Sequence, residues 1–504
     1  MKHEEADICF VLEGSYPYVS GGVSSWVHQL ITNLPDFTFA LAVIMPDKDS
    51  SRTYRYDIPG NVVAIEELYL HGENLPAKHA KKRDKTQWQA VKSFHNSESP
   101  VEKSCLFEKI FTHFFDKDNR CFSPAKILNT KKSWALLKEL YHGKAANDSF
   151  IDYFWSIRFI HQPMFKVLTS ELPKARIYHA VSTGYAGLWA TLGKIKHKKP
   201  LLLTEHGIYT RERRIEISRA DWIYEKNINT IRVDRSYSHF KHIWNKMFGM
   251  LSYLCYSYAD EIITLTKFNQ RYQIEEGADR KKLRIIPNGV DVDGLSKLSI
   301  QPKNSADPFV IGFMGRVVSI KDVKTLIRAC KGASRAIPNM KVFIMGPIDE
   351  EPTYFEDCHR LVNLLDLSEI VTFTGKVDIK EYFPKIDIMV LTSISESQPL
   401  VILEANCIGI PCVSTDVGAC RELLQGVGDE DKALGESGLL AGVTNTREIT
   451  RAIIKLYESP SLRRKMGESG RLRVAKFYSQ KNLENRYRKI YTNYKQAKKS
   501  VHVK

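Results

Sequence analysis

Two successive series of short apolar runs constrain the fold of this chain more than any other feature of the sequence. Each run ends at a turn or at polar residues. Continuous apolar runs of this length are typical of strands buried on both faces, as in a parallel sheet. The first series comprises residues 8–12, 39–44, 62–65, 177–181, 201–203, 262–265 and 283–286, and the second comprises residues 310–314, 342–345, 371–374, 388–391 and 411–415.

Helical patterns alternate with these runs. Between the first two runs, one apolar stripe is formed by Val23, Trp26, Val27, Leu30, Ile31 and Leu34. Two βα series predict an α/β protein with two doubly wound, Rossmann-like domains, in which ligands bind beyond the carboxyl ends of the strands. We expect a first domain at 1–293 with a helical insertion at about 73–150, a linker at 294–307, a second domain at 308–477 and a C-terminal helix at 478–504.

Composition narrows the class of protein. No run of 18 apolar residues occurs in the 504, so we expect no transmembrane helix. The N-terminus lacks the pattern of a signal peptide, and nine cysteines without paired spacing indicate a reducing compartment, so we expect a cytoplasmic protein. The net charge of +16 is compatible with an anionic substrate, an anionic membrane surface or simply a solvated surface. No nucleic-acid module is present in the sequence.

Two acids, Glu396 and Glu404, lie in the segment SISESQPLVILEANCIGIPCVST, between two predicted strands. Their spacing is just over two turns of a helix, and Pro399 is tolerated in a first helical turn. Carboxylates at such a position can accept hydrogen bonds from sugar and ribose hydroxyls, while the N–H groups of the helix start can hold a phosphate. Alternatively, Glu404 is an exposed helix acid, or a partly buried one that has a partner.

Two cations, Arg316 and Lys321, flank the turn after the first strand of the second series. Arginine can grip a diphosphate with two parallel hydrogen bonds, and lysine can do so as a point charge. A pair of surface salt bridges is the alternative. The acid motif downstream favours the diphosphate site.

The first domain offers weaker signals. Gly21 and Gly22 follow the first strand and let the backbone approach a ligand, although their spacing is not that of a dinucleotide or Walker A motif. His206 follows a strand, where a lone histidine is more often structural. The arginines that follow can order a flap, contact an acceptor or form a solvated turn. They are Arg211, Arg213 and Arg214.

The two-acid motif ESQPLVILE, together with TEHGIYTRERRIEI, resembles the retaining GT-B glycosyltransferases of family 4, and among them those of Pel exopolysaccharide synthesis. The resemblance extends from residue 21 to the C-terminal helices. It implies two domains facing a central cleft, with the C-terminal helix crossing back to the first. It also implies transfer of a hexose from a UDP-sugar, such as UDP-glucose, to a growing polysaccharide or its primer. Inner-membrane Pel synthase subunits are the implied partners, and recruitment to the inner membrane face is implied with them.

The resemblance also implies roles for individual residues. Arg316 and Lys321 bind the donor diphosphate and offset charge on the leaving group. Glu396 lies near the donor sugar hydroxyls, and Glu404 holds the ribose. Gln398 departs from the apolar residue or glycine that is usual there and alters the expected sugar pocket. The other implied donor-site residues are Gly21, Gly22, His206, Lys376, Val377, Ser397, Leu400 and Val401.

No cofactor or metal is predicted, because the chain contains no HExxH or CxxC motif and no DxD-like pair stands out at a strand end. Three neighbouring cysteines are interpreted as small core residues; they are Cys407, Cys412 and Cys420. The resulting hypothesis is metal-independent transfer. The alternatives are a non-catalytic UDP-sugar-sensing subunit of a membrane complex, and a phosphorylase or epimerase on the same fold.

Overall fold

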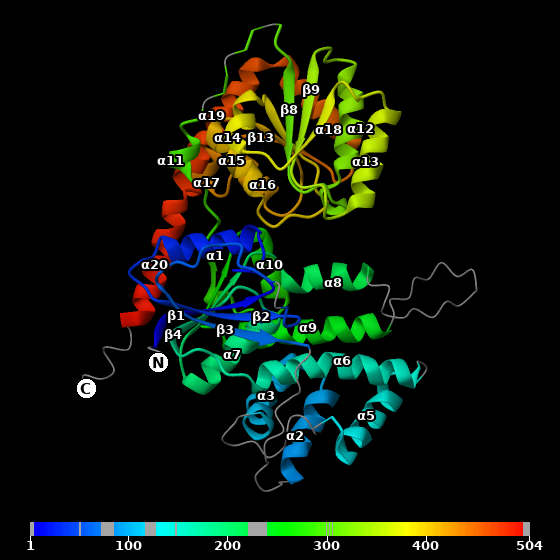
Figure 1. Cartoon of the computed structure of the whole chain (residues 1–504), viewed down its shortest axis with the longest axis vertical. Helices are drawn as coiled ribbons and strands as arrows, with labels where there is room; N and C mark the ends of the chain where they lie inside the picture. The colour runs from blue at the N-terminus through cyan, green and yellow to red at the C-terminus, as the bar shows by residue number, and fades with distance from the viewer. Residues whose placement is uncertain are drawn as a thin grey trace. The chain divides into compact units, whose positions relative to one another are not determined.

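The computed structural model describes residues 5–49, 52–71, 85–115, 128–146, 149–219, 239–298, 300–301, 303–304 and 306–496 (Figure 1). The chain forms two compact units. The first contains Met1–Thr264, Gln270–Arg284 and Arg488–Lys504, and the second contains Leu265–Asn269 and Ile285–Tyr487. Each unit is built on one parallel sheet, which confirms the predicted fold class.

The first unit contains a seven-stranded sheet in the order β3-β2-β1-β4-β5-β6-β7. Its inner strand β1 pairs in parallel with β2 on one side and with β4 on the other. The predicted apolar runs of the first series all form strands. Their bounds are β1 Ala6–Glu13, β2 Phe39–Met45, β3 Val62–Tyr69, β4 Ala175–Ala180, β5 Leu201–Glu205, β6 Glu261–Thr264 and β7 Leu283–Ile285.

Strands β1, β2 and β5 are buried on both faces, which explains why they are apolar without alternation. On one face, the ring of Phe10 lies 5.7 Å from that of Phe39 and 6.0 Å from that of Trp26 in α1 (Gly22–Thr32). On the other face, Val11 belongs to the same core as Leu188 of α7 (Tyr185–His197).

The region of the predicted insertion contains helices α2, α3 and α5 within the described residues, while residues 72–84, 116–127 and 147–148 lie outside them. Residues 220–238 also lie outside the described part of the chain, and the helix that begins at His239 buries Phe248 and Tyr256 in the core of the first unit. The helices concerned are α2 Lys85–Asn96, α3 Pro100–Phe114, α5 Lys131–Lys144, α6 Phe150–Thr169, α8 Tyr209–Arg219, α9 His239–Tyr258 and α10 Lys267–Glu275.

The second unit contains a six-stranded sheet in the order β10-β9-β8-β11-β12-β13. Strand β13 was not predicted from the sequence. Its Gly438 backbone lies so close to strand β12 that a Cβ at this residue would be 2.2 Å from the carbonyl oxygen of Cys412. The other five strands were predicted. The bounds are β8 Phe309–Met314, β9 Met340–Met345, β10 Val371–Gly375, β11 Ile388–Leu391, β12 Cys412–Thr415 and β13 Gly438–Ala441.

Alternate residues of β8 enter two separate cores, as expected for a strand covered on both faces. Ile311 and Phe313 belong to one core and Val310 to the other. Figure 1 shows α12, α13 and α18 on one side of this sheet and α15, α16 and α19 on the other. Their bounds are α12 Val323–Ser334, α13 Pro352–Leu364, α15 Leu400–Ile408, α16 Cys420–Gln425, α18 Thr446–Glu458 and α19 Pro460–Phe477.

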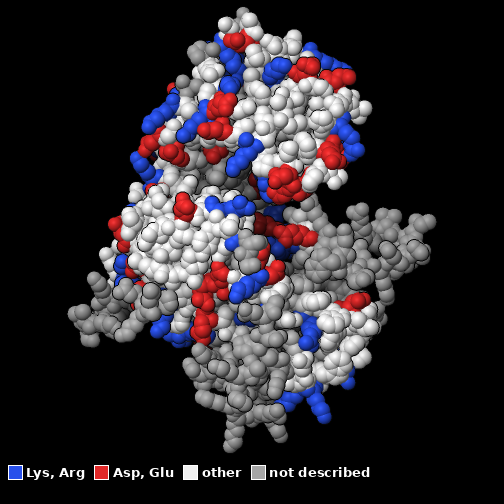
Figure 2. Space-filling view, in the orientation of Figure 1, with Lys and Arg blue, Asp and Glu red and all other residues white. Residues whose placement is uncertain are grey.

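The remaining elements are short, except for the C-terminal helix α20. They are η1 Arg280–Lys282, α11 Val292–Leu295, η2 Ser319–Lys321, α14 Ile379–Tyr382, η3 Phe383–Lys385, α17 Asp429–Lys432 and α20 Gln480–Gln496. Within the part of the chain that the structure describes, none of the helices combines the length and the apolar composition needed to cross a bilayer. On the described surface in Figure 2, basic and acidic side chains are interspersed, which favours the solvated-surface interpretation of the charge.

Candidate functional site

Three glycines join the carboxyl ends of β8, β9 and β10 in the second unit. Gly346 has φ of +142°, and a Cβ at this residue would lie 2.2 Å from the carbonyl oxygen of Gly315. Its N–H donates to the carbonyl oxygen of Gly375 over 2.8 Å. Because only glycine allows this approach, the three strand ends form one tightly packed backbone platform.

An ion pair links the turn after β8 to the loop after β11. Lys321 Nζ lies 2.5 Å from Glu396 Oε1, and the Ser393 hydroxyl donates to the same oxygen over 2.6 Å. The side chains of Lys321 and Glu396 are only 19% and 11% exposed. The two turns are also joined by Thr392, whose hydroxyl donates to the Lys321 carbonyl over 3.0 Å. The structure therefore brings together one cation and one acid that sequence analysis had selected 75 positions apart.

The loop that carries Glu396 packs against the turn after β12. Gly418 has φ of +53°, and a Cβ there would lie 2.0 Å from the Glu396 carbonyl oxygen. The Ala419 N–H donates to the Ser397 carbonyl over 2.9 Å. This close backbone contact fixes the position of Glu396 before any ligand binds.

Arg316 has a different partner from Lys321. Its guanidinium is paired with the Glu350 carboxylate after β9, with Nη1 2.6 Å from Oε2. Both side chains are about half exposed, at 52% and 49%. Arg316 thus forms the surface salt bridge that was the alternative interpretation, although Glu350 leaves its guanidinium accessible to a ligand. Its role at the diphosphate stays a prediction.

Glu404 and Glu396 do not share a helix, contrary to the geometry that their spacing suggested. Helix α15 begins at Leu400 with Pro399 as its N-cap residue, so Glu396 lies in the preceding loop. Glu404 lies one turn into α15 and is half-buried. Burial raises the pKa of its carboxyl, and no described residue donates a hydrogen bond to it. A half-buried acid of this kind is suited to a ligand that brings hydroxyl donors.

Gln398 has a structural explanation. Its side chain is 7% exposed, and its Oε1 accepts a hydrogen bond from the Asn288 N–H over 2.8 Å. The glutamine therefore holds the Asn288–Gly289 segment of the second unit. The effect of Gln398 on the shape of the sugar pocket stays a prediction.

The remaining predicted residues of the second unit occupy the ends of the same strands. Ser397, Leu400 and Val401 are half-buried around the start of α15. Lys376 is exposed and Val377 half-buried, directly after β10. Their roles as ligand contacts stay predictions.

The cysteines between α15 and α16 are core residues. Cys407, Cys412 and Cys420 are all buried, and burial raises the pKa of the Cys407 thiol to about 11 and that of Cys420 to about 12. Among the described residues, no group of three or more His, Cys, Asp or Glu side chains is placed to hold a metal ion.

In the first unit, the predicted residues lie after β1 and β5. A Cβ at Gly21 or Gly22 would meet no atom within 4 Å, so the backbone at the start of α1 is open to a ligand. The His206 ring packs edge-on against Trp26, with centroids 4.7 Å apart. Burial lowers the pKa of His206 to about 4, so its ring is neutral near pH 7.

The arginines after His206 lie on α8. Arg213 pairs with Glu216 at 2.7 Å and lies over the Tyr209 ring, while Arg211 lies 4.0 Å from the centroid of Tyr272. These packed positions favour a structural contribution from both side chains. A role at an acceptor stays a prediction.

Glu205, a buried acid next to His206 in the chain, was not identified as a candidate site residue from the sequence. Its carboxylate accepts hydrogen bonds from the Tyr256 hydroxyl over 2.8 Å and from the Gln273 amide over 2.9 Å. Burial nevertheless raises the pKa of Glu205 from the usual 4.5 to about 7. The TEHG run does not reveal this raised pKa, because the burial that causes it involves residues distant in the sequence, such as Tyr256.

We predict that Glu205→Gln weakens the pH dependence of stability. The raised pKa means that the folded state retains a proton that the unfolded state loses, so stability present below pH 4.5 is lost as the pH rises through about 7. A shift of this size corresponds to about 3 kcal/mol. Urea unfolding of both proteins from pH 4.5 to 8 measures the slope. The exposed Glu171→Gln variant should retain the wild-type slope, and an unchanged slope in Glu205→Gln would contradict the prediction.

Two family models match the chain. Residues 6–281 match the domain of unknown function DUF3492, which is more than half of the chain. Residues 296–473 match Glycosyl transferases group 1 and contain the Lys321–Glu396 pair and Glu404. The second match places the candidate site within a domain of glycosyltransferase type.

Curated relatives match parts of the chain. N-acetyl-alpha-D-glucosaminyl L-malate synthase of Bacillus anthracis is 34% identical over 133 residues, 26% of this chain and 33% of the relative. D-inositol 3-phosphate glycosyltransferase of Pseudarthrobacter chlorophenolicus is 27% identical over 208 residues, 39% of this chain and 47% of the relative. The chain thus spans between a third and a half of the length of these two relatives.

Solved structures match nearly the whole chain in fold. Sucrose-phosphate synthase from Thermosynechococcus elongatus has a TM-score of 0.59 at 16% identity, covering 97% of this chain and 100% of the other. HepE from Anabaena, solved in complex with UDP, has a TM-score of 0.58 at 14% identity with the same coverage. The chain therefore belongs to the DUF3492 family, with a Glycosyl transferases group 1 domain and a GT-B fold.

Proposed function

We propose that this protein is a glycosyltransferase that moves a hexose from a nucleotide sugar, with the donor bound by the second unit. The observation that carries the proposal is the Lys321–Glu396 pair, held at the strand ends of a Glycosyl transferases group 1 domain, with Glu396 in the loop that precedes the helix of the half-buried Glu404. The activities named for the two curated relatives, a synthase forming a glucosaminyl malate and an inositol-phosphate glycosyltransferase, agree with this class.

In the proposed complex, Lys321 directs its remaining N–H donors to the diphosphate, assisted by Arg316 and by the N–H groups of Leu400 and Val401. Glu396 uses Oε1 for Lys321 and Ser393 and offers Oε2 to the sugar hydroxyls. The bond from the anomeric carbon to the diphosphate breaks, and the acceptor oxygen attacks the same face. The acceptor's proton passes to the departing phosphate oxygen. Because the attack occurs on the same face, the configuration at the anomeric carbon is retained. No metal ion takes part in the proposed transfer. The cations offset charge on the leaving group.

The proposed donor is a UDP-hexose such as UDP-glucose. HepE, which shares the fold, has been solved with UDP and with UDP-glucose. The proposed acceptor is a growing Pel-type exopolysaccharide or its primer. We further propose that the protein acts in the cytoplasm beside inner-membrane Pel synthase subunits. It would act in the manner of PelF, the glycosyltransferase of Pel exopolysaccharide synthesis. These proposals rest on the ESQPLVILE and TEHGIYTRERRIEI motifs.

We predict that Glu404→Gln weakens UDP binding by about 10- to 100-fold, because a hydrogen bond to a charged acceptor contributes about 1.5–3 kcal/mol. Calorimetric titration with UDP and with 2′-deoxy-UDP tests the assigned contact directly. Wild-type protein should discriminate between the two ligands, and Glu404→Gln should largely lose that discrimination. The exposed Glu468→Gln on α19 is the matched control. Equal discrimination in both variants would refute the ribose assignment.

The activity itself is tested by incubating purified protein with UDP-, GDP-, ADP- and dTDP-sugars. A bound donor raises the melting temperature of the native protein, and one nucleotide should stand out. Release of UDP with transfer or slow hydrolysis of the sugar supports the enzyme, whereas donor binding without turnover supports a sensing subunit. Loss of turnover in EDTA that magnesium or manganese restores would overturn metal independence.

A further inference from the structure

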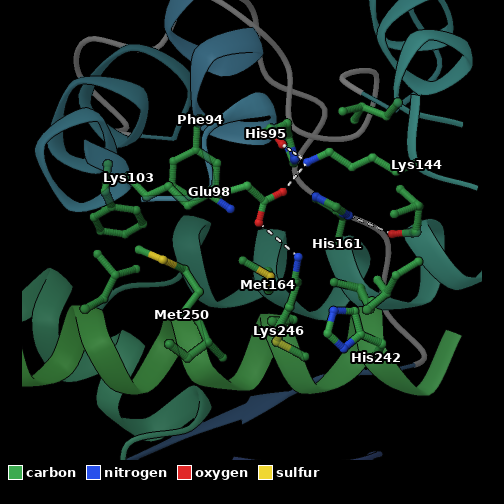
Figure 3. Close-up of a pocket in the computed structure, with 18 of the residues that line it drawn as sticks. Phe94, His95, Glu98, Lys103, Lys144, His161, Met164, His242, Lys246 and Met250 are labelled. Atoms are coloured by element: carbon green, nitrogen blue, oxygen red, sulfur yellow. Dashed lines mark hydrogen bonds and ion pairs between the residues drawn. The ribbon is translucent and has the colours of Figure 1, made fainter. Parts of the chain in front are cut away.

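A cavity of about 190 Å³, partly open to solvent, lies between α2, α3, α5, α6 and α9 of the first unit. Figure 3 shows α9 along one side of it, with Met250 and Lys246 directed toward the cavity. Its walls are mainly apolar and include Phe107, Leu140, Ile160, Met164 and Leu254. Sites for small molecules are typically concave and mostly apolar, with a few placed polar groups. The cavity has this form.

A cluster of charges lies at one side of this cavity. Glu98 accepts hydrogen bonds from Lys144 over 2.8 Å and from Lys246 over 2.9 Å, and both contacts appear as dashed lines in Figure 3. Lys103 also lines the cavity, so three cations accompany one carboxylate. The two lysines lower the pKa of Glu98 to about 2 through these hydrogen bonds, so the carboxylate is ionised at physiological pH. The cluster therefore carries a net positive charge.

A second cavity of about 100 Å³ lies against the first. The two share His95, Leu140, Ile157 and His161 as lining residues. The two histidine rings are 5.2 Å apart, and burial lowers the pKa of both, that of His95 to about 3. Both rings are therefore neutral near pH 7. The residues shared by the two cavities are therefore uncharged, although Arg158 also lines the second cavity.

We propose that this cavity binds a single-chain amphiphile with an anionic head, either a phosphate or a carboxylate. The chain occupies the apolar volume, and the head replaces Glu98 as the partner of Lys144 and Lys246. Charge complementarity selects the anion, and the apolar walls select the chain. This site is formed wholly by the first unit and is independent of the proposed donor site.

The probes for this proposal are decyl phosphate and decanoate below their micellar concentrations, with decanol and inorganic phosphate as partial mimics. Calorimetric titration of the full chain should show saturable binding of at least one anionic amphiphile. Decanol should bind at least 10-fold more weakly, and inorganic phosphate should not bind. The comparison of decyl phosphate with decanoate identifies the preferred head. Equal affinity for decanol and both anions, or no binding of either anion, would overturn the proposal.

Variants separate a binding role from a structural one. Lys144→Met with Lys246→Met should weaken the anionic probe at least 10-fold and leave decanol unchanged, whereas Lys138→Met, an exposed lysine of α5, should change neither. Glu98→Gln should tighten the anion several-fold, because it removes the competing carboxylate. If the cluster only stabilised the fold, Glu98→Gln would not improve binding. Weaker or unchanged anion binding in a folded Glu98→Gln protein would therefore contradict the proposal.

Discussion

Replacing Lys321 by alanine is expected to lower kcat/KM for sugar transfer by about 100- to 1,000-fold, the range found when one group that stabilises developing charge is removed. Lys321 is only 19% exposed and lies 2.5 Å from Glu396, at the joined ends of β8 and β11. The Lys321 side chain is less exposed than that of Arg316, the other predicted cation at this edge of the sheet, which is 52% exposed. Steady-state kinetics with the donor found in the nucleotide-sugar panel measure the loss.

A matched control comes from the next helix. Lys324 is 27% exposed and pairs with Asp357 at 2.7 Å, so Lys324→Ala removes a similar ion pair from the same unit without touching the Glu396 loop. We expect the kcat/KM of Lys324→Ala to stay within about twofold of wild type, because the variant leaves the Glu396 loop untouched. Loss of a partly exposed ion pair also changes the stability of the unit little. Comparable activity in Lys321→Ala and Lys324→Ala would reject the assignment of Lys321 to the diphosphate.

Replacing Arg473 by methionine is expected to destabilise the second unit by about 3–5 kcal/mol, the cost of leaving a buried charge without its partner. Arg473 on α19 is fully buried, and its Nε donates to Asp431 Oδ1 over 2.6 Å. The guanidinium also donates to the carbonyl oxygens of Leu424, at 3.1 Å, and Gly435, at 2.7 Å. Since domains are stable by only about 5–15 kcal/mol, the loss should be large in urea unfolding.

Two further variants identify the cause of that loss. Arg471→Met removes an exposed arginine of the same helix that makes one hydrogen bond, to the Ile408 carbonyl over 2.9 Å, and should cost about 1 kcal/mol. Adding Asp431→Asn to Arg473→Met should recover part of the stability, because it removes the unpaired charge while the amide oxygen still accepts from Val427. No recovery would show that lost packing, rather than charge, dominates.

Most strands were predictable because a strand covered on both faces must be apolar along its whole length. The run that became β8 supplies Ile311 to one core and Val310 to the other, and no polar residue could occupy either position cheaply. Strand β13 was not predicted because Gly438 and Ala441 are small residues, and their burial depends on their close approach to β12.

Candidate site residues were predictable as residue types, but their partners were not. The motifs selected Lys321, Glu396 and Arg316, yet nothing in their spacing distinguished a lysine paired with Glu396 from an arginine paired with Glu350. Likewise, nothing in the sequence indicated that the amide oxygen of Gln398 accepts a hydrogen bond from the Asn288 backbone. Pairing depends on which strand ends are neighbours, and β8 and β11 are adjacent only in the folded sheet.

The sequence by itself determined the two parallel sheets and the strand ends at which polar side chains collect, because apolar periodicity and glycine turns are local properties of the chain. Only the tertiary structure decided which charges meet, which acid has a raised pKa and where the insertion leaves a cavity. Desolvation and ion pairing depend on atoms that are distant in the chain, as Glu205 and Arg473 both demonstrate.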